Sequence, residues 1–409
     1  MNATIIFKRQ FALRVTLLLT LILIVVFASS RLQADTGTCG GRAITLPFTD
    51  VPAANGFFCQ IASAFFSGLS NGTTATTFSP SDPVTREQMA AFVSRTLEQS
   101  IRRNNLRAVT KKWYLPPDPT GITVRGVDSQ PDALEFDGTD IWVANVATIQ
   151  RLRTSDGQIL QTFTEVTSVQ ELVAAGGRIF ATGDGNPGRL YFIDPTAGAG
   201  PVSTLLNNLP ANPTGIAFDG ARVWTANASG SVSIITINPP NATNVAAGFT
   251  RPQGILFDGA NMWVTDAGQS RLLKLDANGN VVQSIPVGSV GNTPRHMVFD
   301  GINIWVSNNT TSSITVVRVK DTQGNALATP FVLATLTGNG LDRPNAIAFD
   351  GERILVANGF AATVSLFKAA DLTPLGSIQT GINTFPSGAC SDGMNFWVTL
   401  SGTDRLARF

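Results

Sequence analysis

Histidine and cysteine are the residue types best suited to metal binding and covalent chemistry, and this 409-residue sequence holds one histidine and three cysteines. Because His296 stands alone, the chain by itself cannot build a multi-histidine metal cage or a pair of imidazoles for acid–base catalysis. Cys39 and Cys59, 20 residues apart, could form a disulfide outside the cytoplasm. Cys390 lies in a distant strand-like segment, where a small buried apolar side chain is expected. The spacing of these residues predicts neither a metal site nor a cofactor.

Polar side chains recur directly after a regularly spaced residue, most often proline, in the C-terminal part of the chain. Seven such positions hold Asp132, Gln170, Thr214, Gln253, Arg295, Asn345 and Ser387. The next position is small in most copies, but it is Glu171 in one and His296 in another. If these copies begin strands around a common axis, the side chains form a polar ring at the mouth of a narrow channel, which suits a small ligand or a peptide. Strand ends that simply face water would show the same residue types, so both interpretations stay open.

Catalysis at this ring would need groups that the sequence supplies sparingly. Asp132 and Glu171 are its only acids, whereas a metal-dependent hydrolase needs several carboxylates and amides around one cation. His296, beside Arg295, is the only candidate base for a lyase. We therefore predict a binding platform with no catalytic residue. An extracytoplasmic lyase or lactonase centred on these four residues is the alternative.

The ring positions belong to a repeat of about 42 residues that fills the C-terminal part of the chain. Five copies carry Phe-Asp-Gly and two carry degenerate forms, with the glycine at positions 138, 176, 220, 259, 301, 351 and 393. The Asp-Gly pair suits a tight hairpin turn, and the large side chain four residues later suits packing between adjacent blades. The sequence thus predicts a mainly β fold, a seven-bladed β-propeller over residues 121–409. Its last blade is expected to take its fourth strand from Gly121–Val127.

The repeats resemble the YVTN/NHL-like bacterial propellers, and they also resemble streptogramin-lyase-like and lactonase-like propellers. This resemblance implies a seven-bladed β-propeller. Propellers of these kinds include enzymes as well as pure binding platforms, so the resemblance does not by itself assign an activity.

Residues 45–100 are predicted to form a small module of two amphipathic helices. Phe57, Ile61, Phe65 and Leu69 recur every four residues and form one apolar stripe. Thr85 followed by Gln88 has the spacing of a capping box, so the second helix is expected to begin there. The apolar face of that helix is expected to comprise Met89, Phe92, Val93 and Leu97.

Three short strings in this module carry a second resemblance. Phe48–Pro52 reads F-x-D-V-P, Gly68–Gly72 reads G-L-S-N-G, and Phe78–Met89 reads F-S-P-x-x-P-V-T-R-E-Q-M. Together they resemble one S-layer homology (SLH) motif. The resemblance implies non-covalent attachment to a cell-wall polymer, a pyruvylated saccharide or peptidoglycan, and it carries the binding positions onto Asp50, Gly68, Gly72, Arg86 and Glu87.

The chain departs from the SLH pattern in two respects. The family usually presents three motifs where this sequence has one, and it carries an acid where this sequence has Gln88. The planar guanidinium of Arg86 suits a carboxylate on a sugar polymer. A capped helix start with solvated charges would equally account for Arg86 and Glu87.

The N-terminal segment has the pattern of a secretory signal. Lys8, Arg9 and Arg14 precede the uncharged run Val15–Ala28, and Ala34 could end a cleavage site. We predict a signal peptide over residues 1–34. An uncleaved anchor is the alternative, although this apolar run is shorter than the roughly 20 residues of a spanning helix.

Charge and linker composition complete the predicted organisation. Residues 101–120 are expected to be a linker, basic at first and then rich in proline. With 29 basic and 28 acidic residues, the chain has no strong field for a nucleic acid. The predicted protein is extracytoplasmic and associated with the cell envelope, with no spanning segment after signal cleavage. Its expected partners are the wall polymer and a protein, peptide or small ligand of unknown identity on the propeller.

Overall fold

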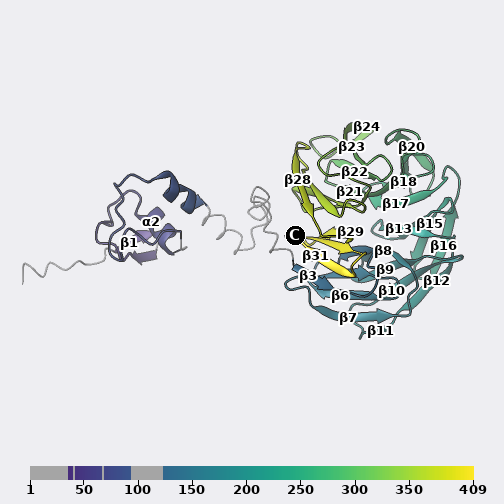
Figure 1. The fold of residues 1–409 in the computed structure, drawn as a ribbon, viewed down its shortest axis with the longest axis horizontal. Coiled ribbons are helices and arrows are strands. Elements are labelled where there is room, and N and C mark those ends of the chain that lie inside the picture. The colour runs from purple at the N-terminus through teal and green to yellow at the C-terminus, as the bar shows by residue number, and fades with distance from the viewer. Residues whose placement is uncertain (1–35, 40–41, 67–68, 94–122) are drawn as a thin grey trace, which may run out of the picture. The chain divides into compact units, whose positions relative to one another are not determined.

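A computed structural model of the chain describes residues 36–39, 42–66, 69–93 and 123–409 (Figure 1). The chain divides into two compact units, Met1–Val109 and Thr110–Phe409, which are described separately. The predicted signal peptide at 1–34, the predicted linker at 101–120 and Gly68 lie outside the described residues.

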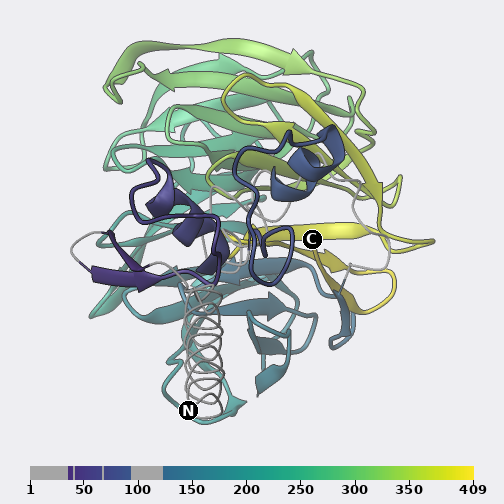
Figure 2. The ribbon, with the colours of Figure 1, turned by 90° about the vertical axis from the view of Figure 1, so that its left-hand side faces the viewer.

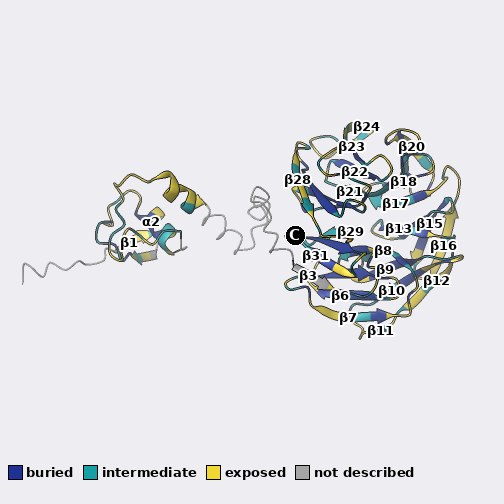
Figure 3. Cartoon of the chain, in the orientation of Figure 1, coloured by how far each residue is buried: buried dark blue, intermediate teal, exposed yellow. Residues whose placement is uncertain are grey.

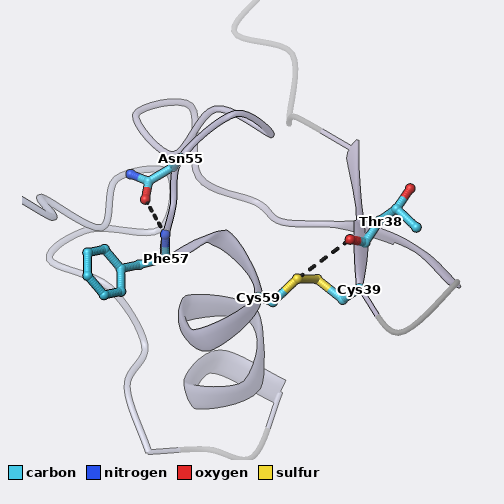
Figure 4. Close-up of a disulfide and its surroundings, with 5 residues drawn as sticks. All are labelled: Thr38, Cys39, Asn55, Phe57 and Cys59. Carbon is cyan, nitrogen blue, oxygen red and sulfur yellow. Dashed lines mark hydrogen bonds between the residues drawn. A yellow bond between two sulfur atoms is a disulfide. The ribbon is translucent and has the colours of Figure 1, made fainter.

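The described residues of the N-terminal unit form a two-stranded sheet and two short helices (Figure 2). The antiparallel strands are β1 (Thr36–Cys39) and β2 (Arg42–Thr45), and the first helix is α2 (Phe58–Phe66). A disulfide joins Cys39 at the end of β1 to Cys59 in α2 (Figure 4). The pairing considered from the sequence is therefore present, and it fixes the sheet to the helix.

The structure differs from the predicted stripe at both of its ends, since Phe57 precedes α2 and Leu69 lies beyond its last residue, Phe66. Phe57 is 69% exposed, because the helix begins one residue later. Asn55 accepts a hydrogen bond from the Phe57 backbone N–H at 2.8 Å, which places Phe57 before the first helical turn (Figure 4). The buried face of α2 is instead formed by Phe58, Ile61 and Ala62. It packs in a cluster with Leu46, Phe48, Val51 and the partly buried Phe65 and Phe78.

The second helix covers residues 86–93 of the described chain and begins as predicted. The Thr85 N–H donates to Gln88 Oε1 at 2.9 Å, and the Gln88 N–H donates to Thr85 Oγ1 at 3.2 Å, so the capping box is formed. Met89 and Val93, which were predicted on its apolar face, are 53% and 58% exposed. No described element covers them, and Leu97 lies outside the described residues.

The C-terminal unit is a seven-bladed β-propeller, as predicted (Figure 1). Each blade is an antiparallel sheet of four strands in chain order from the axis outward. Blade 1 consists of β4 (Ala133–Phe136), β5 (Asp140–Ala144), β6 (Ile149–Arg153) and β7 (Ile159–Thr164). Blade 2 consists of β8 (Val169–Ala175), β9 (Arg178–Gly183), β10 (Gly188–Ile193) and β12 (Ser203–Leu209). In blade 1, the short β11 (Gly200–Pro201) from the neighbouring blade adds a fifth strand parallel to β7.

Blades 3 to 6 repeat this arrangement. Blades 3 and 4 consist of β13 (Pro213–Phe218), β14 (Val223–Asn227), β15 (Ser231–Ile237) and β16 (Pro240–Val245), and of β17 (Pro252–Phe257), β18 (Met262–Asp266), β19 (Arg271–Leu275) and β20 (Val281–Pro286). Blades 5 and 6 consist of β21 (Pro294–Phe299), β22 (Asn303–Asn308), β23 (Ser313–Lys320) and β24 (Ala326–Leu336), and of β25 (Pro344–Phe349), β26 (Arg353–Asn358), β27 (Thr363–Lys368) and β28 (Pro374–Gln379).

The two ends of the propeller sequence meet in blade 7. Its strands are β29 (Pro386–Ser391), β30 (Phe396–Leu400), β31 (Arg405–Arg408) and β3 (Thr123–Gly126). The last of these comes from the N-terminal side and pairs Thr123 with Arg408. The predicted closure of the ring by an N-terminal strand is therefore confirmed.

The second strands of the blades form the buried layer between neighbours, whereas the outer strands are mostly exposed (Figure 3). Trp224 packs in one cluster with Ile255, Val264 and Leu273 of the next blade, as expected for the repeated aromatic. In five blades the indole N–H donates to the aspartate five residues earlier, at 2.7–2.8 Å. The aspartate of Phe-Asp-Gly therefore stabilises the blade contact as well as the turn.

Candidate functional site

The first candidate site lies in the N-terminal unit, and Asp50 has a positioning role there. Its carboxylate accepts hydrogen bonds from the Phe78 N–H at 2.8 Å and from the Ser79 N–H at 2.7 Å. Burial alone would raise the pKa of Asp50, but these backbone N–H groups hold the pKa below its ordinary value. Asp50 thus fixes the loop that leads to the second helix.

Gly72 also serves the structure of this loop. Its backbone has φ of +79°, and an added Cβ would lie 2.5 Å from both the Phe48 ring and the Thr77 carbonyl oxygen. Only glycine fits without a shift of the buried phenylalanine. The glycine predicted from the motif is therefore needed to close the loop.

Arg86 and Glu87 occupy the first turn of the second helix, directly after the capping box. Both side chains are exposed. Within the described residues, neither makes a hydrogen bond or an ion pair. A fixed loop and a capped helix start therefore present one guanidinium and one carboxylate to solvent, where a polymer could reach them.

The second candidate site is the axis of the propeller, where the seven inner strands surround a cavity of about 480 Å³. Of the predicted ring residues, Asp132, Glu171 and His296 line this axial cavity. Gln170 lines a neighbouring groove of about 440 Å³ at the channel mouth, which shares Asp132 with the cavity. The remaining five predicted residues line neither space: Thr214, Gln253, Arg295, Asn345 and Ser387.

Several of these remaining side chains connect neighbouring blades. The Thr214 hydroxyl donates to the Gln253 carbonyl oxygen at 3.0 Å, and the Ser387 hydroxyl donates to the Pro131 carbonyl oxygen at 3.1 Å. Arg295 Nη1 donates to Asn345 Oδ1 at 2.9 Å. These contacts give the ring a structural function in addition to any contact with a ligand.

A bulge at the start of the inner strands explains why these ring side chains contact the neighbouring blade and do not line the cavity. The pairing of β13 with β14 shifts between Pro213 and Gly215, and the same shift occurs after the first residue of β8, β17, β21, β25 and β29. The extra residue redirects the side chain next to it. The bulge also brings neighbouring blades close, because a Cβ on Gly254 would overlap the Arg295 carbonyl oxygen.

A hydroxyl on the second strand, which was not predicted from the sequence, completes the inter-blade contact. Thr265 Oγ1 accepts a hydrogen bond from the Gly254 N–H at 2.8 Å and donates to the Arg295 carbonyl oxygen at 2.6 Å. Ser307 and Thr399 make the equivalent bonds in their blades. The signal that could have found them is a Thr or Ser two residues after the repeated aromatic.

A side-chain contact between opposite blades spans the channel. His296 Nδ1 lies 3.3 Å from Glu171 Oε2, which joins β21 of blade 5 to β8 of blade 2. Asp132 lies nearby, and burial raises its pKa, an effect opposed in part by His296 and Arg295. The structure thus brings together three of the four residues of the alternative catalytic centre around the cavity, while Arg295 bonds to the next blade.

Two further ionisable residues, neither of which was predicted to belong to the channel, line the cavity. Burial raises the pKa of Glu135 to about 8 and raises the pKa of the Cys390 thiol well above its ordinary value. Both occupy the fourth position after the strand-start residue, where the other copies carry Val173, Ala217, Leu256, Val298 and Ala348. An acid at an otherwise apolar repeat position was the available signal.

Metal and membrane sites were also sought in the described part of the chain. It contains no group of three or more His, Cys, Asp or Glu side chains that could hold a metal ion. None of its helices has the length and apolar character needed to cross a membrane.

Comparison with known proteins supports both halves of the sequence interpretation. Residues 65–90 match the model of the S-layer homology domain, which implies cell-wall anchoring and a location in the cell envelope. No curated protein matches the chain. The chain therefore combines an SLH segment with a seven-bladed propeller.

The propeller is similar in fold to several solved structures. A streptogramin B lyase matches with 18% identity and a TM-score of 0.57, over 70% of this chain and 97% of that one. The virginiamycin B lyase from Staphylococcus aureus matches with 16% identity and a TM-score of 0.58, over 70% and 98%. The propeller domain of Cps50 (Swd1) from Myceliophteria thermophila matches with 11% identity and a TM-score of 0.59, over 70% and 99%. At these identities the likeness establishes the fold alone.

Proposed function

We propose that this protein is exported and held non-covalently on a cell-wall polymer by its SLH segment, and that its propeller is a binding platform. The observation that carries the anchoring role is the SLH match over residues 65–90, together with a loop and cap that present Arg86 and Glu87 to solvent. The residues carried over from the SLH motif differ in role. Asp50 and Gly72 shape the loop before the second helix, and the side chain of Arg86 is exposed in its first turn.

The chemistry of Arg86 suits an anionic wall polymer. A guanidinium can donate two parallel hydrogen bonds to a carboxylate, such as that of a pyruvylated saccharide or of a peptidoglycan stem peptide. Its exposed position in the first turn leaves its guanidinium accessible to the polymer.

Co-sedimentation of the full chain with isolated host cell-wall sacculi tests this role. We expect Arg86→Ala to reduce the bound fraction at least about ten-fold, the loss of one charge-assisted contact. Arg153→Ala is the matched control, because Arg153 is a half-exposed arginine of the propeller paired only with nearby Asp156. Equal binding by wild type and Arg86→Ala would contradict the assigned role of Arg86.

A propeller enzyme is the second candidate function, and one observation favours it. The Glu171–His296 pair lies beside Asp132 at the axial cavity, so a base and its partner are within hydrogen-bond range of each other. Among the proteins of similar fold, a catalytically inactive virginiamycin B lyase was solved with quinupristin. Incubation of the full chain with quinupristin, with His296→Ala alongside, separates the candidates. Turnover of quinupristin by the wild type that His296→Ala abolishes would show that the propeller is a lyase. If the propeller is only a binding platform, neither the wild type nor His296→Ala should turn over quinupristin.

A further inference from the structure

The axial cavity has an unbalanced charge, and this feature goes beyond a generic binding platform. Its ionisable lining groups are three carboxyl groups, one imidazole and one thiol, and no lysine or arginine is among its described lining residues. His296 is paired with Glu171. The electrostatic interactions of His296 and Arg295 favour the charged form of Asp132. Among the described lining residues, Glu135 is left without a cationic partner.

The described residues satisfy little of the hydrogen-bonding capacity of the Glu135 carboxyl group. Glu135 is partly buried, and among the described residues its carboxyl group accepts one hydrogen bond, a long one of 3.3 Å from the Ala174 N–H. A carboxyl group has up to four acceptor positions, and a buried carboxylate without a counter-charge is costly. The remaining acceptor capacity of Glu135 faces the cavity.

The groups around Glu135 do not supply that counter-charge. Glu171 and Asp137 both interact unfavourably with its charged form, and Glu135 in turn disfavours ionisation of Cys390. The imidazole of His296 lies against Glu171 instead. A cation that entered the cavity would therefore meet a carboxyl group with no competing positive charge beside it.

The rest of the wall indicates what kind of cation fits. Beside these polar groups, the lining includes partly buried apolar side chains of the inner strands, among them Val173, Met297 and Val298. A bare divalent ion needs several oxygen ligands around one point, and the described residues contain no such group. An organic cation needs a single carboxyl group for its charge and an apolar surface for its methylenes, which is the combination present here.

We propose that the axial cavity binds a small alkylammonium ligand, with its ammonium group against Glu135 and its aliphatic part against the inner strands. The inference names the ligand class of the proposed platform and rests on that function. The ligand reaches the cavity from the mouth groove, since Asp132 lines both spaces.

Isothermal titration of the full chain with n-butylammonium, at about pH 8, where about half of Glu135 is ionised, tests the site. We expect saturable binding that Glu135→Gln weakens at least ten-fold. Glu352→Gln, which removes an exposed carboxylate of the same propeller, should leave the affinity unchanged. n-Butanol, which has the same chain without the charge, should bind at least ten-fold more weakly.

The pH dependence of wild-type binding provides a second readout that does not depend on a variant. The pKa of about 8 keeps Glu135 protonated at lower pH, and a bound ammonium stabilises the carboxylate. The affinity should therefore fall at least about ten-fold between pH 8 and pH 6, with proton release on binding near neutral pH. An affinity that does not change between these values overturns the assignment to Glu135.

The remaining outcomes also decide the proposal. The absence of saturable n-butylammonium binding, or equal binding of n-butanol, would overturn it, as would complete displacement by Mg²⁺, which would indicate a metal site. The same preparation is sedimented with sacculi. Retention on the wall without ammonium binding would contradict the proposed cavity ligand but not the anchoring role. Ammonium binding without retention on the wall would contradict only the anchoring role.

Discussion

Asp50, Glu135 and Asp258 are three carboxyl groups that this fold uses in three different ways. Asp50 accepts backbone N–H groups and fixes a loop. Asp258 accepts two backbone N–H groups with one oxygen and the Trp263 indole N–H with the other, at 2.8 Å. Glu135 has one long hydrogen bond and lines a cavity. Two of these groups have their bonds satisfied by the protein itself, and only Glu135 leaves most of its capacity unused.

Glu135 should make the stability of the propeller depend on pH. Its pKa is about 8 in the folded chain against 4.5 ordinarily, so the folded state retains a proton that the unfolded state loses. The free energy of unfolding should therefore fall as pH rises from about 4.5 to about 8, by up to about 5 kcal/mol. Thermal unfolding of the full chain across this range, compared with Glu135→Gln, measures the effect. We expect a shallower slope in the variant; the same slope in both proteins would rule out Glu135 as its source.

Asp258 should stabilise the fold through its hydrogen bond with the Trp263 indole as well as through its turn contacts. Asp258→Ala removes the turn contacts and leaves the buried Trp263 N–H unpaired, which should lower the free energy of unfolding by about 2–3 kcal/mol. Asp276 accepts the Asn278 and Asn280 N–H groups in an exposed turn without an indole, so Asp276→Ala is the matched control, with an expected loss below about 1 kcal/mol. Urea unfolding compares the two. Equal losses would mean that the indole bond adds nothing.

At the scale of elements, the inner strand and its neighbour show where sequence reasoning succeeds and where it stops. The proline, the Asp-Gly turn and the aromatic position follow from local conformational preferences, and all three are found where the repeat predicted them. The bulge after the proline depends on a contact with the next blade, as does the hydroxyl of Thr265. Such non-local contacts leave no mark in local propensity, so the orientation of the ring residues could not be predicted.

The bulge requires a residue without a Cβ at position 254, because the next blade lies close to the backbone there. A Cβ there would overlap the carbonyl oxygen of Arg295 in the next blade, so Gly254→Ala should lower the free energy of unfolding by about 1–3 kcal/mol. Gly126 in β3 is the control, because a Cβ there meets nothing within 4 Å and Gly126→Ala should change stability by less than about 0.5 kcal/mol. Denaturant midpoints of both variants measure the difference. A neutral Gly254→Ala would show that the blades can separate at no cost.

The same limit applies to the N-terminal unit. The capping box at Thr85 was predictable, because its two hydrogen bonds join residues three apart. The start of α2 was predicted one residue early, because the spacing of aromatics does not reveal that Asn55 caps the helix. A four-residue period alone cannot separate Phe57 from Phe58.

At the scale of the whole molecule, the chain joins a disulfide-stabilised SLH unit to a propeller closed by its own N-terminal strand. Length, repeat period and turn chemistry were enough to predict seven blades and their closure, because each blade repeats the same local pattern. The channel chemistry was predicted only in part, since Glu135 is a single departure from the repeat and its importance depends on burial. The proposed division of labour places attachment in one unit and ligand binding in the other.

The most direct test of the central claim is the distribution of the protein in host cells. Washed cell walls and culture medium are compared for wild type, Arg86→Ala and Arg153→Ala, each as the full chain. We predict that wild type and Arg153→Ala are recovered with the walls and that Arg86→Ala is released into the medium. Recovery of all three proteins in the walls, or of all three in the medium, would contradict attachment through the SLH segment.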